Sequence, residues 1–174
     1  MDEFDNETSL NPRIIQAHKN ELAAIALTST GNLLATASKR GTLIRIFLTT
    51  GLCEKIFEFQ RGLDTAAIYS LAFSFNSGFL CVSSDKGTVH VYSIRDSKLN
   101  RKATFQHILN EVCSDSCNFN VNSEQPCICA FSDLNHVVAA SVNGTFHKYI
   151  LSSNGKCNRE VYEMYLDEND GCNF

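Results

Sequence analysis

Arginine, hydroxyl and imidazole side chains gather around short glycine-containing turns in this sequence. Arg61 stands in the tetrapeptide 59–62, between two copies of one pattern, residues 33–47 and residues 79–92. Each copy has an apolar stretch, a polar turn that includes Gly-Thr, and a second apolar stretch that ends in an aromatic residue. Arginine offers a planar fork of N–H donors, and hydroxyls and imidazole add single hydrogen bonds. The sequence therefore predicts a local site for an anion such as phosphate.

A third copy of the pattern follows, so the chain is built of repeats. The Gly-Thr pairs begin at Gly41, Gly87 and Gly144, which are 46 and 57 residues apart. A basic residue stands two positions before each closing aromatic residue, and that spacing puts both on one face of a strand. The three basic residues are Arg45, His90 and His147.

Each repeat also contains further short apolar stretches separated by turn residues. The first strand of each repeat is predicted at 22–27, 68–73 and 127–131, and the second at 33–38, 80–84 and 137–142. Poorer outer strands are predicted at 53–59 and 160–166. About 45 residues with four short strands is the signature of a β-propeller blade.

We therefore expect an all-β, WD40-like β-propeller with four antiparallel strands per blade. Three blades are fewer than the four to eight with which propellers close, so the pattern indicates the C-terminal part of a larger ring. We predict a disordered N-terminal segment at 1–11, a partial propeller at 12–167 and a C-terminal tail at 168–174. The three blades of the propeller are expected at about 12–60, 61–122 and 123–167, with an inserted loop at about 95–116.

The inserted loop begins with basic residues and continues with apolar residues at helical spacing. The apolar residues are Phe105, Ile108, Leu109 and Val112. This spacing predicts one face of a short amphipathic helix. Such a helix could contact an anionic membrane, or it could pack its apolar stripe on the propeller, and the sequence leaves both possibilities open.

Composition restricts the classes of function. The net charge is −4, so anion binding must come from a local site. No apolar run approaches the ~20 residues that span a bilayer, and we expect no signal peptide because residues 1–11 are polar and acidic. The eight cysteines include no C-x-x-C pair, so free cytosolic thiols are expected rather than disulfides or zinc ligands. No metal or other cofactor is predicted.

Enzyme motifs are missing from the sequence. It contains no Gly-x-Ser-x-Gly, no phosphate-binding P-loop and no His/Glu set with metal spacing. Ser84 and His90 could form a Ser/His pair, but the available acid, Asp85, belongs to the predicted turn. We therefore expect a protein that is not an enzyme.

Residues 35–47, 59–62 and 83–90 resemble the PROPPIN family, the WD-repeat phosphoinositide-binding propellers that include the WIPI proteins of autophagy. The resemblance extends over about 12–167, and residues 143–149 and 157–160 look most like the WIPI branch numbered four. It implies a seven-bladed ring of which this chain holds blades five to seven. It also implies binding of phosphatidylinositol 3-phosphate and the 3,5-bisphosphate at two sites that flank a Phe-Arg-Arg-Gly motif.

The family's binding residues carry over by position. The first site would use His18, Thr36, Ser38, Gly41, Thr42, Arg45 and Gln60; the second would use Arg61, Ser84, Thr88 and His90. Gln60 replaces the first arginine of the motif, so the first site should be weakened because a neutral amide forms weaker hydrogen bonds than a charged group. The family's membrane-dipping loop corresponds to the insertion with Phe105, Ile108 and Leu109.

The resemblance implies a cytoplasmic, peripheral membrane adaptor on preautophagosomal or endosomal membranes. Its expected partners are phosphatidylinositol 3-phosphate, phosphatidylinositol 3,5-bisphosphate, the membrane surface and autophagy proteins, among them a lipid-transfer protein whose contact region would lie in the missing blades. No nucleic acid is expected. The alternative is a WD-repeat scaffold for protein interactions that has lost lipid binding, which Gln60 and the missing blades both permit. Salt-sensitive binding to anionic liposomes would separate the two.

Overall fold

The chain is built from three four-stranded antiparallel sheets that follow one another in sequence. The computed structural model describes residues 12–94, 117–121, 125–152 and 156–165, and within these ranges it contains twelve strands and no helix. The expected all-β architecture with four strands per blade is confirmed. The predicted insertion at 95–116, with its apolar stripe, lies outside the described residues.

Each sheet is a simple up-and-down meander of four consecutive strands. We call the three sheets blades 1, 2 and 3. Blade 1 comprises β1 (Leu22–Leu27), β2 (Leu33–Ser38), β3 (Leu43–Leu48) and β4 (Lys55–Gln60). Blade 2 comprises β5 (Ile68–Phe73), β6 (Phe79–Ser84), β7 (Thr88–Ser93) and β8 (Cys117–Asn120). Blade 3 comprises β9 (Cys127–Phe131), β10 (His136–Ser141), β11 (Thr145–Leu151) and β12 (Cys157–Met164).

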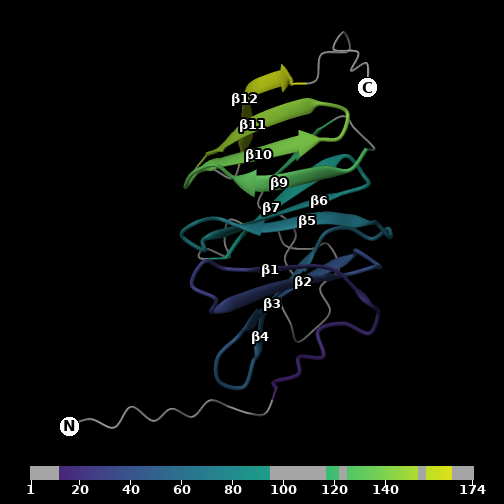
Figure 1. Ribbon diagram of the computed structural model, residues 1–174, viewed down its shortest axis with the longest axis vertical. Coiled ribbons are helices and arrows are strands. Elements are labelled where there is room, and N and C mark those ends of the chain that lie inside the picture. Colours follow the sequence, from purple (N-terminus) through teal and green to yellow (C-terminus); the bar gives the residue numbers. More distant parts are fainter. Residues whose placement is uncertain (1–11, 95–116, 122–124, 153–155, 166–174) are drawn as a thin grey trace, which may run out of the picture.

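The blades stack face to face along the long axis of the molecule, in sequence order (Figure 1). Their first strands are neighbours in series, β1 beside β5 and β5 beside β9, and their last strands form the opposite edge. The first strands of all three repeats, and β2, begin and end at the predicted residues. Apolar residues between turn signals located these strands correctly, although β1 itself is largely exposed.

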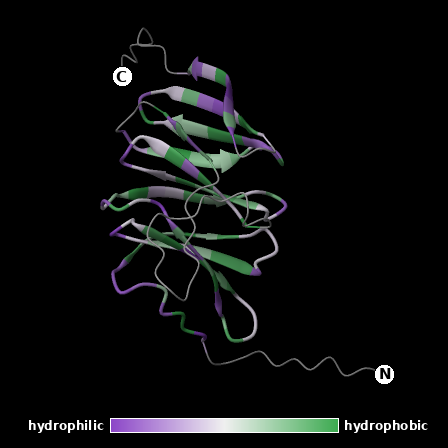
Figure 2. Cartoon of the chain, turned by 180° about the vertical axis from the view of Figure 1, so that it is seen from behind, coloured by the Kyte–Doolittle hydropathy of each residue, from purple (hydrophilic) through white to green (hydrophobic). Residues whose placement is uncertain are grey.

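Two hydrophobic cores fill the spaces between the blades. One lies between blades 1 and 2 and includes Ile44, Ile46 and Val82; the other lies between blades 2 and 3 and includes Val89 and Val91. Figure 2 shows hydrophobic residues concentrated in the strands and hydrophilic ones in many of the turns. Because side chains alternate along a strand, β5, β6 and β7 of blade 2 each serve both cores.

The Gly-Thr turns adopt the backbone conformation that their glycines allow. Gly41, Gly87 and Gly144 have φ of 66°, 65° and 85°, in the left-handed region that side chains with a Cβ rarely adopt. Gly41 is restricted further, because a Cβ there would overlap the carbonyl oxygen of Ala66. The Gly41 turn therefore packs closely against the segment that links blade 1 to blade 2.

The expectation that the cysteines are free thiols is wrong for one pair. Cys117 and Cys157 form a disulfide between blades 2 and 3. Cys53, Cys81, Cys127 and Cys129 are free, as expected. The pairing escaped sequence analysis because the two residues are 40 positions apart and meet only where the outer strands of two blades approach.

Candidate functional site

Three of the expected second-site residues lie around the turn between β6 and β7. Ser84 ends β6, Thr88 begins β7, and His90 follows two residues later. Alternation along β6 puts Ser84 on the same side as Leu80 and Val82, which belong to the core with blade 1. The structure therefore brings these three residues to the end of blade 2 and turns them toward blade 1.

The orientation of β7 is fixed by aromatic packing. Tyr92 stacks on Phe59 of β4, with ring centroids 4.6 Å apart, and is fully buried between blades 1 and 2. Thr88, His90 and Tyr92 alternate onto one face of β7, and the His90 ring stacks beside that of Tyr92 with centroids 6.5 Å apart. The expected pairing of base and aromatic on one strand face is confirmed here.

Arg61 immediately follows β4 and is 8% exposed. Its main-chain N–H donates to the carbonyl oxygen of Thr42 at 2.9 Å. Its Nε donates to the carbonyl oxygen of Gly41 at 2.6 Å, and its Nη2 donates to that of Asp64 at 2.6 Å. No described residue accepts from Nη1. Arg61 thus supports the β2–β3 turn while part of its donor fork stays available to a ligand.

The segment that Arg61 opens connects the turns of both blades. The N–H of Ala66 donates to the carbonyl oxygen of Arg40 in the turn of blade 1, at 3.1 Å. The carbonyl oxygen of Ala67 accepts from the N–H of Asp85 in the turn of blade 2, at 3.0 Å. Residues 61–67 therefore tie the Gly41 turn to the turn that carries Ser84 and Thr88.

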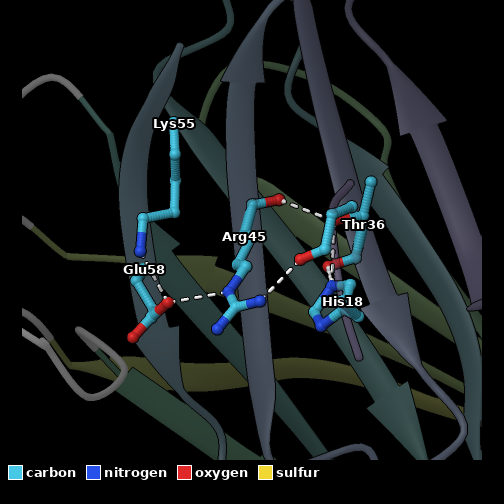
Figure 3. Close-up of polar contacts among 6 residues, drawn as sticks. His18, Thr36, Arg45, Lys55 and Glu58 are labelled. Atoms are coloured by element: carbon cyan, nitrogen blue, oxygen red, sulfur yellow. Dashed lines mark hydrogen bonds and ion pairs between the residues drawn. The ribbon is translucent and has the colours of Figure 1, made fainter. Parts of the chain in front are cut away.

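The expected first-site residues occupy the other face of blade 1, away from blade 2 (Figure 3). Thr36 on β2 pairs in register with Arg45 on β3. The Nε2 of His18 lies 3.0 Å from the Thr36 hydroxyl, and the Nη1 of Arg45 donates to the Ala17 carbonyl oxygen at 2.5 Å. The structure thus brings His18, Thr36 and Arg45 together, although they come from distant parts of the first repeat.

Glu58 completes this row and was missed by sequence analysis. It is the cross-strand partner of Arg45 on β4, and its Oε2 accepts from Arg45 Nε at 2.7 Å and from Lys55 Nζ at 2.8 Å. Burial raises the pKa of Glu58, but the hydrogen bonds from Lys55 and Arg45 outweigh it and lower the pKa overall. A carboxylate therefore already holds the cation that was expected to hold phosphate. Its position two residues before Gln60, opposite a basic strand residue, was the available signal.

The remaining first-site candidates contribute in different ways. Ser38 is buried and alternates onto the face of Thr36, and Gln60 alternates onto the face of Glu58. The carbonyl oxygens of Gly41 and Thr42 accept hydrogen bonds from the side chain and the main-chain N–H of Arg61, so both residues already have a structural role. The first site is assembled in one place, but its charge is largely neutralised from within.

His18 is uncharged near neutral pH in this setting. Burial is the main reason that its pKa is lowered below the ordinary 6.5, and the nearby Arg45 charge lowers it further. A main-chain contact with Thr36 and the charge of Glu58 act in the opposite direction but do not prevail. His18 can accept or donate one neutral hydrogen bond there.

Blade 3 repeats the second-site pattern without its arginine. The positions of Ser84, Thr88 and His90 are taken in blade 3 by Ser141, Thr145 and His147. The position of Arg61 is taken by Val121, which follows β8 and donates its N–H to the carbonyl oxygen of Gly87 at 2.9 Å. His147 is 1% exposed and packs between the rings of Tyr149 and Tyr162. The structural role expected for His147 agrees with this burial.

The described residues contain no group of three or more His, Cys, Asp or Glu side chains arranged to hold a metal ion. Within the same residues, no helix is long and apolar enough to cross a membrane.

Comparison with known proteins decides the family. The family model described as PROPPIN matches residues 4–121, which is more than half of the chain. The chain belongs to the PROPPIN family. Similar curated relatives are both named Autophagy-related protein 18: one from Eremothecium gossypii is 47% identical over 92 residues, 52% of this chain and 17% of the relative. One from Dictyostelium discoideum is 45% identical over 93 residues, 53% of this chain and 25% of the relative.

Solved structures support the same assignment. The PROPPIN chain matches Hsv2 of Kluyveromyces lactis with a TM-score of 0.72 and 26% identity, over 86% of this chain and 49% of that one. A second structure of Hsv2 from the same organism matches with a TM-score of 0.76 and 24% identity, over 93% and 54% of the two chains. The chain therefore spans about half the length of the solved propellers and a quarter or less of these curated relatives. The narrower resemblance to the fourth WIPI branch stays a prediction.

Proposed function

We propose that this PROPPIN chain is a non-catalytic, phosphoinositide-binding peripheral membrane adaptor in autophagy. Its ligands would be phosphatidylinositol 3-phosphate or the 3,5-bisphosphate on cytoplasmic faces of preautophagosomal or endosomal membranes. The observation that carries the proposal is the tie made by residues 61–67. Arg61 bonds to the Gly41 turn at one end of this segment, and Ala67 bonds to the turn between Ser84 and Thr88 at the other. The names of the Autophagy-related protein 18 relatives support the autophagy role.

A phosphate at this place would find donors of complementary kinds. The Nη1 of Arg61 would supply a charge-assisted hydrogen bond, which is about twice as strong as a neutral one. The side chains of Ser84, Thr88 and His90 would add single bonds. Since the whole chain carries a net charge of −4, binding would depend on these local donors rather than on long-range attraction. Phe105, Ile108 and Leu109 of the insertion would add apolar contact with the bilayer.

The test must separate binding from folding. Arg61→Ala would remove the bonds to Gly41 and Asp64 as well as the charge, so lost binding in that variant would be ambiguous. Thr88 is a better target, because among the described residues its hydroxyl donates only to the carbonyl oxygen of Lys86 in its own turn, at 3.3 Å. Thr88→Val and His90→Phe remove ligand donors and leave the guanidinium in place.

The experiment is flotation of the purified chain with vesicles that contain phosphatidylinositol, phosphatidylinositol 3-phosphate or the 3,5-bisphosphate. We expect flotation with the two phosphorylated lipids only, and a loss of about tenfold or more in affinity for each variant. His136→Gln, on blade 3 and far from the site in sequence, is the control and should bind as the wild type does. Flotation that is unchanged in both variants would overturn the site, and absence of flotation by a folded chain would overturn the function.

The alternative function is a scaffold for autophagy proteins that has lost lipid binding. Two observations favour it: Gln60 brings no charge to the first site, and Glu58 already pairs with Arg45. A structural neighbour at 22% identity and a TM-score of 0.66 is titled as a complex of KlAtg21 with the coiled-coil of AgAtg16. In this second role the chain would bind other autophagy proteins, including a lipid-transfer protein. If the folded chain fails to float with the vesicles, such protein partners should be sought instead.

A further inference from the structure

Cysteines are concentrated between blades 2 and 3. Five of the eight belong to or pack against the hydrophobic core that joins these blades: Cys81, Cys117, Cys127, Cys129 and Cys157. The core between blades 1 and 2, by contrast, contains no cysteine among its described residues. The proposed phosphoinositide site makes no use of this chemistry.

Cys117 and Cys157 hold equivalent places in the two blades. Cys117 is the first residue of β8 and Cys157 the first residue of β12, the outermost strands of blades 2 and 3. Their Cα atoms are 6.1 Å apart and their sulfur atoms are bonded. The bond is a covalent link between the outer edges of two sheets that otherwise meet through side-chain packing and through hydrogen bonds from Ser70 and Ser83 to the main chain of β9.

The strand that this disulfide anchors is short and supports the candidate site. β8 has four residues, whereas β4 and β12 have six and eight. It pairs with β7 alone, with Asn118 opposite His90 and Asn120 opposite Thr88. Phe119 of β8 also stacks on Tyr149 in the core between blades 2 and 3, so the disulfide adds a covalent anchor to a short edge strand that backs β7 at these positions.

The remaining thiols of this core are poorly suited to oxidation. Burial raises the pKa of Cys127 to about 11, and burial also raises that of Cys81. The hydrogen bond with Cys81 lowers the pKa of Cys129, but Cys129 is only 4% exposed, so burial rather than its pKa shields it from an oxidant. Cys157 is partly exposed and Cys117 is 7% exposed. Access therefore favours Cys157 as the first sulfur that an oxidant reaches.

We propose that Cys117 and Cys157 form a reversible redox site, in which oxidation clamps β8 to blade 3 and reduction releases it. In a cytoplasmic protein a disulfide of this kind is characteristic of a transient or redox-sensing pair rather than of a permanent staple. The proposal does not require that blade 2 binds lipid.

Hydrogen peroxide serves as the oxidant and a dithiol as the reductant. Cys157 first loses its thiol proton, and the thiolate attacks one peroxide oxygen; the O–O bond breaks to give the sulfenic acid and hydroxide, and the hydroxide takes up the released proton to become water. The Cys117 thiol then attacks the sulfenic sulfur, the S–O bond breaks, and a second water leaves with the thiol proton. Two sulfur atoms lose two electrons in all, which reduce one peroxide to two waters. A dithiol reverses the change by thiol–disulfide exchange and is itself oxidised to a disulfide.

The test combines differential alkylation with amide hydrogen exchange on the whole chain. After hydrogen peroxide treatment, peptide mapping should find Cys117 and Cys157 linked and Cys53 alkylated. After dithiothreitol treatment, both should become alkylated while the chain stays folded, and amide exchange over β8 should rise about tenfold or more. Because this comparison uses the wild-type chain, it does not depend on the folding of any variant.

Cys117→Ser and Cys157→Ser provide the second arm. Both should show the fast β8 exchange of the reduced wild type and no further response to dithiothreitol, and Cys53→Ser should respond as the wild type does. Alkylation of both cysteines in the peroxide-treated folded chain, pairing of either with another cysteine, or exchange over β8 that ignores reduction would each overturn the proposal.

Discussion

The Nε of Arg61 donates to the carbonyl oxygen of Gly41 across the end of blade 1, at 2.6 Å. The side chain that suits phosphate best in this chain is therefore also a brace for the Gly41 turn of the same blade. Stability and ligand binding share this residue, and experiments on it must measure both.

Arg61→Met should destabilise the chain even without a ligand. The variant loses the donors to Gly41 and Asp64, of which only the Gly41 bond is fully buried, and hydrogen bonds to charged groups contribute about 1.5–3 kcal/mol each. We expect the free energy of unfolding in urea to fall by about 2–4 kcal/mol. Arg40→Met, at an exposed turn position, should change it by less than about 0.5 kcal/mol. Equal losses of unfolding free energy in the two variants would show that the hydrogen bonds of Arg61 do not stabilise the turn.

Gly41→Ala should be among the most damaging single changes in blade 1. It combines a left-handed φ of 66° with overlap between the new Cβ and the Ala66 carbonyl oxygen. We expect a loss of about 3 kcal/mol or more in urea unfolding. Gly31→Ala is the matched control, with φ of 71° but nothing within 4 Å of the added Cβ, and should lose only about 1–2 kcal/mol. A control loss as large as that of Gly41→Ala would disprove the steric contribution.

Glu58→Gln should strengthen binding to anionic phosphoinositide vesicles. The substitution removes the negative charge that pairs with Arg45 and Lys55, and so leaves the first site with two uncompensated cations. We expect affinity to rise severalfold, and more at low salt because screening weakens charge attraction. Glu21→Gln removes the exposed partner of Lys39 instead and controls for net charge. The same gain in both variants would assign the effect to overall charge.

Gln60→Arg should restore part of the first site, because it adds a charged donor on the strand face that carries Glu58 and Arg45. In the otherwise unchanged chain, Glu58 would compete with the ligand for the new arginine. We therefore expect a modest gain in vesicle affinity from Gln60→Arg alone, and a gain larger than the sum of the two single effects when it is combined with Glu58→Gln. Strictly additive free energies of binding would mean that the two residues do not interact.

His147 should make the chain less stable in mild acid. Burial, followed by the charge of Arg159, lowers its pKa below the ordinary 6.5, although the nearby Val121 main chain opposes this. The unfolded chain then binds a proton that the folded chain resists, so this stabilisation is complete above about pH 6.5 and is lost as the pH falls through the folded pKa. Urea unfolding at about pH 7.5 and about pH 5.5 should show a decline that His147→Phe reduces.

His136 should affect the pH dependence of stability in the opposite direction to His147. Its hydrogen bond to Asp133 is the main reason that its pKa is raised, and Glu160 adds to this. Its contribution is present below the unfolded pKa and is lost as the pH rises through the folded value. His136→Gln should therefore steepen the acid decline slightly, whereas a decline that His147→Phe leaves untouched would exclude His147 as its source.

The sequence by itself determined the repeats and most of the strands. The spacing of Gly41, Gly87 and Gly144, together with apolar alternation, is local information, and both cores between blades require that alternation. The face shared by His90 and Tyr92 was predictable for the same reason. Residue types also located the hydroxyl, imidazole and guanidinium groups that could meet a phosphate.

Only the tertiary structure decided how these groups are already occupied. Arg61 is held by carbonyl oxygens of Gly41 and Asp64, and Arg45 by Glu58, because strand register and the blade turn place these acceptors beside them. The disulfide between Cys117 and Cys157 likewise depends on two outer strands meeting across a blade interface. Periodicity along a chain specifies which face a side chain occupies, but contacts between strands far apart in sequence are specified only when the blades pack.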